Sequence, residues 1–237
     1  MTTSSYLSDW VCKDEVGNSI QKIEKFLPHC GDLRRILDIG CGAGAVSGEL
    51  VKRNVEVYGL DSQPVAVELA KKKGIRAVVH DLNEPLPFQK HFFDLVLVLD
   101  VLDFVQAPHA LLEEIRRVLK PSGNAIVVLP NAFDLRQRLK IISGHGIVSY
   151  KMAVYDTPVD PWAYLHIKFF THMEMRRLFA AAKFSVERED FIPIWKGGLG
   201  IVAKTIYRIL CRPYFVRRFP GTFSSSISFL LKPQGTG

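Results

Sequence analysis

The hydrophobic and polar positions of the chain divide it into short apolar runs and longer amphipathic stretches. The runs 36–39, 93–99 and 125–130 are almost continuously apolar, which is typical of parallel strands covered on both faces. Between them lie stretches with apolar residues at helical spacing, such as 16–28 and the segment that begins at Pro108. Five such alternations predict an α/β fold with a doubly wound, mostly parallel sheet, whose ligand lies at the carboxyl ends of the strands.

The second half of the chain continues this pattern with longer connections. Thr171 and Glu174 predict a capping box for a helix that runs to Lys183. Alternating residues predict a sixth strand over 184–191 and a last strand over 222–231, and a turn is expected at Phe219-Pro220-Gly221.

The first strand runs into a glycine-rich turn, Gly40-Cys41-Gly42-Ala43-Gly44, which predicts a nucleotide-like ligand. Glycine allows a ligand to approach the backbone closely, and the N–H groups of the following helix are free to face it. The turn also fits the dinucleotide fingerprint, and Asp61, 21 residues after Gly40, suits a ribose in either class of protein. Asp38 decides between them, because a carboxylate there would repel a pyrophosphate and attract the amino group of a methionyl moiety.

With Asp38 included, the run Ile36 to Gly44 resembles motif I of the class I S-adenosylmethionine-dependent methyltransferases. The turn Leu119-Lys120-Pro121-Ser122-Gly123 is also a recurrent feature of that family, and Asp100-Val101-Leu102-Asp103 resembles the Glu-Val-Leu-Glu-His run of its ubiquinone-type members. The Tyr-Asp-Thr-Pro run at 155–158 and the His-x-x-Phe-Phe-Thr run at 166–171 resemble the methionine-biosynthesis W-type subgroup. The resemblance implies a Rossmann-like seven-stranded sheet of order 3-2-1-4-5-7-6, with the last strand antiparallel.

The same resemblance implies a single methyltransferase domain over 1–237. Its N-terminal helical cap would be 1–30, and its substrate-side insertions 131–170 and 192–221. Asp61 would hold the ribose hydroxyls, Ser62 and Gln63 would lie beside the adenine, Asp81 would accept the adenine amino group, and Leu82 would supply a backbone N–H. The complete expected set of S-adenosylmethionine contacts is Asp38, Gly40, Cys41, Gly42, Gly44, Asp61, Ser62, Gln63, Asp81, Leu82 and Leu99.

The expected reaction is methyl transfer to a small or amphipathic acceptor, with O-methylation slightly favoured over N-methylation. A hydroxyl acceptor of ordinary pKa needs a general base, yet Phe104 stands where the ubiquinone-type pattern has histidine. We therefore predict His166 as the catalytic base, with Tyr164 or Asp103 as helper. The alternative is an S-adenosylmethionine-binding regulatory or partner protein without its own methyl transfer, which the W-type resemblance also allows.

Charge is distributed unevenly. The formal net charge is +7, and no Asp or Glu follows Asp190, whereas seven Lys and Arg do, so the C-terminal part carries the whole excess. The pattern of 199–212 predicts an amphipathic helix, and 199–218 is the segment expected to contact an anionic membrane surface peripherally. A cover over the substrate pocket, a subunit contact and ordinary solvated cations are the alternatives.

The expected partner is a small-molecule or a lipid- or glycan-linked acceptor rather than a nucleic acid. The first 190 residues are electrically balanced, and the (Asp/Asn)-Pro-Pro-aromatic motif of enzymes that methylate nucleic-acid amines is absent. The four cysteines have no metal-ligand spacing, so no metal site is expected. Scattered thiols and the lack of an apparent secretory signal or apolar span favour a cytoplasmic location.

Overall fold

The computed structural model describes residues 15–144, 168–193 and 213–235. In chain order the helices and strands are α2 (Glu15–Glu24), η1 (Leu27–His29), β1 (Arg35–Ile39), α3 (Ser47–Val51), β2 (Glu56–Asp61), α4 (Pro64–Lys72), β3 (Arg76–Val79), β4 (Phe93–Leu99), α5 (Pro108–Val118), β5 (Leu119–Pro130), α6 (Leu135–Ile142), α7 (His172–Ala181), β6 (Phe184–Pro193), α9 (Pro213–Arg218), α10 (Pro220–Phe223) and β7 (Ser224–Pro233).

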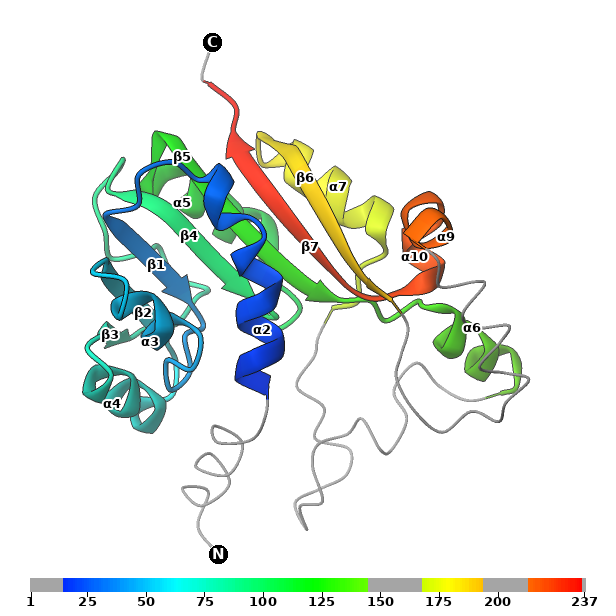
Figure 1. Cartoon of the computed structure of the whole chain (residues 1–237), viewed down its shortest axis with the longest axis horizontal. Helices are drawn as coiled ribbons and strands as arrows, with labels where there is room; N and C mark the ends of the chain where they lie inside the picture. Colours follow the sequence, from blue (N-terminus) through cyan, green and yellow to red (C-terminus); the bar gives the residue numbers. More distant parts are fainter. Residues whose placement is uncertain (1–14, 145–167, 194–212, 236–237) are drawn as a thin grey trace, which may run out of the picture.

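The seven strands form one twisted sheet in the order β3-β2-β1-β4-β5-β7-β6 (Figure 1). Strands β1 to β5 pair in parallel, while β7 is antiparallel to both of its neighbours. The predicted fold class and strand order are thereby confirmed. The carboxyl ends of β1, β2, β3 and β4 meet at one edge of the sheet, where a ligand of a doubly wound fold is expected.

Alternate residues of the central strands supply two hydrophobic cores, one on each face of the sheet. In β1, Leu37 and Ile39 belong to a core with side chains of α5 and α7, such as Leu112 and Phe179. Ile36 and the other set of strand residues pack with α2, α3 and α4 on the opposite face. Because both faces are covered, the central strands are apolar almost without interruption, as the sequence pattern indicates.

Helix α2 crosses the face of the sheet that α3 and α4 also cover (Figure 1), and several contacts hold it there. Ile23 of α2 and Phe26, two residues after its end, are buried in the hydrophobic core on this face. Ion pairs join Lys22 and Glu24 of α2, and Lys25 just after it, to separate parts of the fold: Lys22 to Asp100 at 3.8 Å, Glu24 to Arg53 at 2.5 Å, and Lys25 to Asp190 at 2.5 Å. The region predicted as a helical cap therefore contacts both halves of the sheet.

The structure departs from the predicted elements at three places. The predicted turn at 119–123 lies within β5, because Leu119 already pairs with Phe93 and the register then shifts so that Leu95 pairs with Asn124. The predicted turn at 219–221 becomes the short helix α10. Helix α7 has the predicted capping box but ends at Ala181, before Lys183, whose φ of +60° is incompatible with a right-handed helix.

Within the described ranges, the helices are too short or too polar to cross a lipid bilayer. The predicted amphipathic helix over 199–212 lies outside the residues that the structure describes.

Candidate cofactor site

The glycine turn between β1 and α3 is held against β2 by backbone hydrogen bonds. The N–H groups of Gly40 and Cys41 both donate to the carbonyl oxygen of Leu60, at 2.7 and 3.0 Å. Gly40 and Gly42 have φ of +69° and +50°, a conformation that residues with a Cβ adopt only at a cost. A Cβ on Gly40 would lie 2.5 Å from Val101, whereas one on Gly42 would meet nothing within 4 Å. The turn therefore has open space at Gly42, the position where a ligand is expected to approach the backbone.

Asp38 lies near the end of β1 and is almost completely buried, with 3% of its surface exposed. The hydroxyl of the buried Ser47, at the start of α3, donates to its carboxylate. Burial raises the pKa of Asp38 to about 7; the Ser47 hydrogen bond opposes this shift and the negative charge of Asp61 adds to it. A buried carboxylate with so little compensation gains strongly from a cationic ligand group brought beside it.

Asp61 ends β2 and connects its strand to the glycine turn. One carboxylate oxygen accepts the Gly42 N–H at 2.8 Å, and the other accepts the Gln63 N–H at 2.9 Å. A carboxylate has about four lone-pair positions, so Asp61 can accept further hydrogen bonds from vicinal hydroxyl groups such as those of a ribose. Ser62 and Gln63 are exposed beside it at the start of α4, as expected for residues that flank a bound base.

Asp81 follows β3 and is exposed at the same edge of the sheet. The pKa of Asp81 is lowered first by the backbone N–H of Asn83 and then by the Asn83 side-chain amide; both donate to one carboxylate oxygen, at 2.9 and 2.8 Å. Asn83 in turn accepts the Gln106 N–H at 2.9 Å, which links this loop to the segment before α5. Asp81 is thus ionised and oriented, and Leu82 beside it is half-buried.

Leu99 and Cys41 supply apolar surface around the turn. Leu99 is the last residue of β4 and packs against the core under α2, α3 and α4. Cys41 is buried, and its Sγ atom lies so close to β2 that a Cβ on Gly59 would be only 2.7 Å away. Burial is the largest cause of the raised pKa of the Cys41 thiol, which is therefore protonated and acts here as a small apolar group.

Of the three predicted catalytic residues, the structure describes Asp103. This residue lies in the turn after β4 and is 3% exposed. Its carbonyl oxygen accepts the Lys168 N–H at 3.1 Å, so the segment that begins at Lys168 is anchored to the end of β4. Phe104, at the position of the family histidine, is 40% exposed. His166 and Tyr164 lie outside the described residues.

Four strand ends together present an acidic edge. Asp38, Asp61, Asp81 and Asp100 come from β1, β2, β3 and β4 or the residues that follow them. Such an edge disfavours a pyrophosphate and favours a ligand that carries positive charge. The open space at Gly42, the weakly compensated carboxylate of Asp38 and the acceptor capacity of Asp61 all fit S-adenosylmethionine, with its sulfonium, ammonium and ribose groups.

Three residues that shape this site were not predicted from the sequence. Ser47 supports Asp38, Asn83 orients Asp81, and Lys22 of α2 lies 3.8 Å from Asp100. Ser47 could have been noticed as a small polar residue among the apolar positions that follow the turn. The Lys22 contact depends on how α2 packs across the sheet, and no local pattern indicates it.

The buried carboxyl of Asp38 should make the stability of the free protein depend on pH. Its ordinary pKa is 3.8 and its folded value about 7, so the folded state binds more protons between these values and stability falls as pH rises through this window. The free energy of unfolding of the unmodified protein should fall by about 2–3 kcal/mol between pH 5 and pH 8, and Asp38→Asn should abolish this fall. Urea unfolding at both pH values measures it.

The matched control for this prediction is Asp81→Asn, a change at an exposed strand end. The pKa of Asp81 is lowered, so this variant should have the same pH dependence as the unmodified protein above pH 5. If the free energy of unfolding of Asp38→Asn and of the unmodified protein changed with pH by the same amount, the assignment of a protonated Asp38 would be contradicted.

Comparison with known proteins agrees with this geometry. A family model described as a methyltransferase domain matches residues 37–127, which include the glycine turn and the ends of β1 to β4. The chain is 31% identical over 109 residues to the mitochondrial ubiquinone biosynthesis O-methyltransferase of Schizosaccharomyces pombe, covering 42% of this chain and 39% of that protein. It is 30% identical over 120 residues to an uncharacterized protein of Methanocaldococcus jannaschii, covering 50% and 54%.

The chain thus matches about half or less of the length of these curated relatives. Among solved structures, a SAM-dependent methyltransferase from Archaeoglobus fulgidus has the same fold, with a TM-score of 0.63 over 92% of this chain and 94% of that chain, at 17% identity. S-adenosylmethionine is the cofactor of this family, in agreement with the prediction. The chain therefore carries a class I S-adenosylmethionine-dependent methyltransferase domain.

Proposed function

We propose that this protein transfers a methyl group from S-adenosylmethionine to a hydroxyl group of a small or amphipathic acceptor. The observation that carries the proposal is the acidic strand edge around the open glycine turn, which lies within the segment matched by the methyltransferase family. The similarity to a ubiquinone biosynthesis O-methyltransferase supports oxygen over nitrogen as the methyl acceptor.

Each strand-end residue has a distinct part in holding the cofactor. Asp38 would bind the ammonium group of the methionyl moiety, which stabilises the ionised form of this buried carboxylate. Asp61 would accept the ribose hydroxyls while it keeps the Gly42 N–H in place. Asp81 and the backbone of Leu82 would bind the adenine edge. When bound, S-adenosylmethionine supplies an already activated methyl group on a sulfonium sulfur.

The protein's contribution to the transfer is then orientation, exclusion of water and removal of a proton. An acceptor hydroxyl must align with the methyl group, and its proton must leave as the new oxygen–carbon bond forms. Phe104 cannot take that proton because its ring has no basic atom. We propose His166 for this step, with Asp103 and Tyr164 as helpers. The hydrogen bond from Lys168 to Asp103 supports the proposal, because Lys168 follows His166 by two residues along the chain.

Methyl-labelled S-adenosylmethionine, incubated with the purified protein and a fractionated host extract, tests the proposal. We expect label in a product heavier by one CH2 group, carried on oxygen and recovered mainly from an amphipathic fraction. Mass spectrometry of the product identifies both the acceptor and the methylated atom. If S-adenosylhomocysteine stabilises the protein against heat but no fraction becomes labelled, the regulatory or partner role would replace the enzymatic one.

A further inference from the structure

Helix α6 presents an apolar face that the described parts of the chain leave exposed. Leu139 and Ile142 are 57% and 81% exposed, and Ile141 between them is 40% exposed. Gln137 is the one buried residue of this helix. The exposed Leu139 and Ile142 lie on one helical face, which the half-buried Leu135 continues at i, i+4, i+7 spacing, so they form a stripe rather than scattered positions.

The same helix is cationic on the flanks of this stripe. Arg136, Arg138 and Lys140 are all exposed, and the helix contains no acidic residue. The neighbouring acid is Asp134, which is buried, caps the helix and pairs with Arg136 at 2.6 Å. Arg138 and Lys140 therefore carry charge that no carboxylate on α6 neutralises.

A second exposed cationic and aromatic segment comes from α9 and the residue after it. Tyr214 is 70% exposed and Phe219 is 48% exposed. Arg217 and Arg218 are exposed between them, and the Arg218 guanidinium lies 5.2 Å from the centre of the Phe219 ring. An amphipathic arginine or aromatic side chain of this kind suits the boundary between a polar and an apolar medium.

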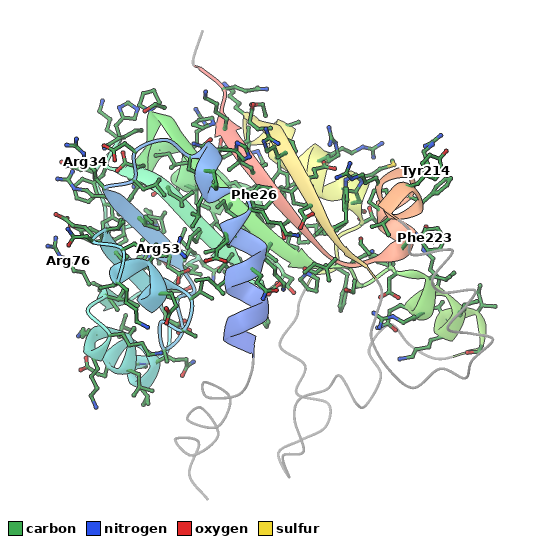
Figure 2. The ribbon with its side chains drawn as sticks, viewed as in Figure 1. Phe26, Arg34, Arg53, Arg76, Tyr214 and Phe223 are labelled. Atoms are coloured by element: carbon green, nitrogen blue, oxygen red, sulfur yellow. The ribbon has the colours of Figure 1, made fainter. Side chains whose placement is uncertain are left out.

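Both segments emerge at the end of the sheet formed by the carboxyl end of β5 and the start of β7. Asn131, just after β5, donates from its side chain to the carbonyl oxygens of Gly221 and Ser224, at 3.3 and 2.7 Å, and its backbone N–H donates to Ser225. Figure 1 shows α6, α9 and α10 together beyond this end, and Figure 2 shows Tyr214 at the periphery of the molecule there. The exposed residues of α6 and of 213–219 are named here the α6/α9 surface.

We infer that the α6/α9 surface binds an anionic lipid bilayer. Aliphatic and aromatic side chains combine there with five Arg and Lys (136, 138, 140, 217 and 218), while 135–142 and 213–219 contain no Asp or Glu and Asp134 before α6 is buried. This combination suits insertion at an anionic interface. A protein partner would also cover the apolar stripe, but the positive charge around it favours the lipid surface. This membrane binding rests on the proposed function and deepens it, because a bilayer would present amphipathic acceptors to the methyltransferase.

The placement of this surface relative to the cofactor site supports that purpose. The carboxyl ends of the parallel strands β4 and β5 lie at the same edge of the sheet, so Asp103 after β4 and Asn131 after β5 leave it at that edge. A bilayer bound to the α6/α9 surface would thus adjoin the edge that holds the cofactor. Membrane contact was predicted through 199–218; the α6/α9 surface combines α6 with 213–218, the described part of that segment.

Flotation of the full chain with lipid vesicles tests the inference without cofactor or acceptor. We expect the protein to float with vesicles of phosphatidylcholine and phosphatidylglycerol at low salt, and not with phosphatidylcholine alone. Leu139→Asp/Ile142→Asp should reduce the floated fraction roughly tenfold, and Arg217→Glu/Arg218→Glu should reduce it and weaken its salt dependence. The control Lys72→Glu/Lys90→Glu makes the same change in net charge at exposed lysines of α4 and of the loop before β4, and should float normally.

Equal flotation of the Lys72/Lys90 and Arg217/Arg218 variants would overturn the inference, because binding would then follow net charge alone. Absence of flotation with anionic vesicles at low salt would also overturn it. A concentration-dependent dimer that Leu139→Asp/Ile142→Asp abolishes, without flotation, would assign the surface to a second copy of the chain. None of these outcomes bears on methyl transfer, which the stabilisation by S-adenosylhomocysteine and the labelled product test separately.

Discussion

Replacing Asp61 by alanine is expected to lower the affinity for S-adenosylhomocysteine by roughly 100-fold or more, since hydrogen bonds to a charged group contribute about 1.5–3 kcal/mol each. The ribose hydroxyls would lose the carboxylate that accepts them, and the Gly42 N–H, which donates to Asp61 at 2.8 Å, would lose its partner. Titration calorimetry measures the affinity. At concentrations of S-adenosylhomocysteine that saturate the unmodified protein, Asp61→Ala should show no thermal stabilisation. NAD should stabilise neither the variant nor the unmodified protein.

Two further variants separate binding from folding in this experiment. Asp61→Asn keeps an oxygen that can accept the Gly42 N–H, so it should fold like the unmodified protein yet bind the nucleoside weakly. Asp32→Ala removes an exposed aspartate before β1, whose contact is an exposed ion pair with Arg34, and should bind normally. An unchanged affinity in Asp61→Ala would remove Asp61 from the ribose site.

Replacing His166 by alanine is expected to slow methyl transfer by about 10²–10⁴-fold, the usual contribution of a general base. Cofactor affinity should change little, because the assigned cofactor contacts come from the strand ends. The rate of the unmodified protein should rise with pH through the titration of the base, and the variant should lose that rise. Single-turnover transfer to the identified acceptor, measured between pH 5.5 and pH 9, checks both expectations.

His166→Gln serves as the conservative variant, since it keeps a polar group of similar reach but cannot take a proton. It should be as slow as His166→Ala if the histidine acts as a base. Full activity of either variant at every pH would assign proton removal to another group or to an acidic acceptor. Asp103→Asn, at the buried residue whose carbonyl oxygen anchors Lys168, then tests whether the helper carboxylate is required.

The fold and the glycine turn could be predicted from sequence because each depends on a local pattern. A strand buried on both faces must be apolar throughout, and a backbone with positive φ at Gly40 and Gly42 strongly favours glycine, so both features are visible in a short window. The end of α7 before Lys183 and the helix at 220–223 were mispredicted, because their boundaries depend on tertiary packing rather than on propensity.

The residues that hold the site in place were harder to predict than the residues expected to contact the cofactor. Asp38 could be identified beside the glycines, but its partner Ser47 is nine residues away and contacts it only once α3 has folded against β1. Lys22 meets Asp100 across 78 positions of the chain for the same reason. The acceptor is harder still, because the two segments predicted to border the substrate, 131–170 and 192–221, have no sequence pattern that fixes a ligand's shape.

The three ion pairs made by residues 22–25, at the end of α2, have a consequence for how the molecule unfolds. They connect α2 to Arg53 beside β2 and to Asp100 after β4, and Lys25, the residue after the helix, to Asp190 on β6; Ile23 and Phe26 add a shared apolar contact. The nucleotide-side half of the sheet and its antiparallel half are thereby tied to a common element. Loss of α2 would weaken both halves at once, so the domain should melt in one cooperative transition rather than half by half.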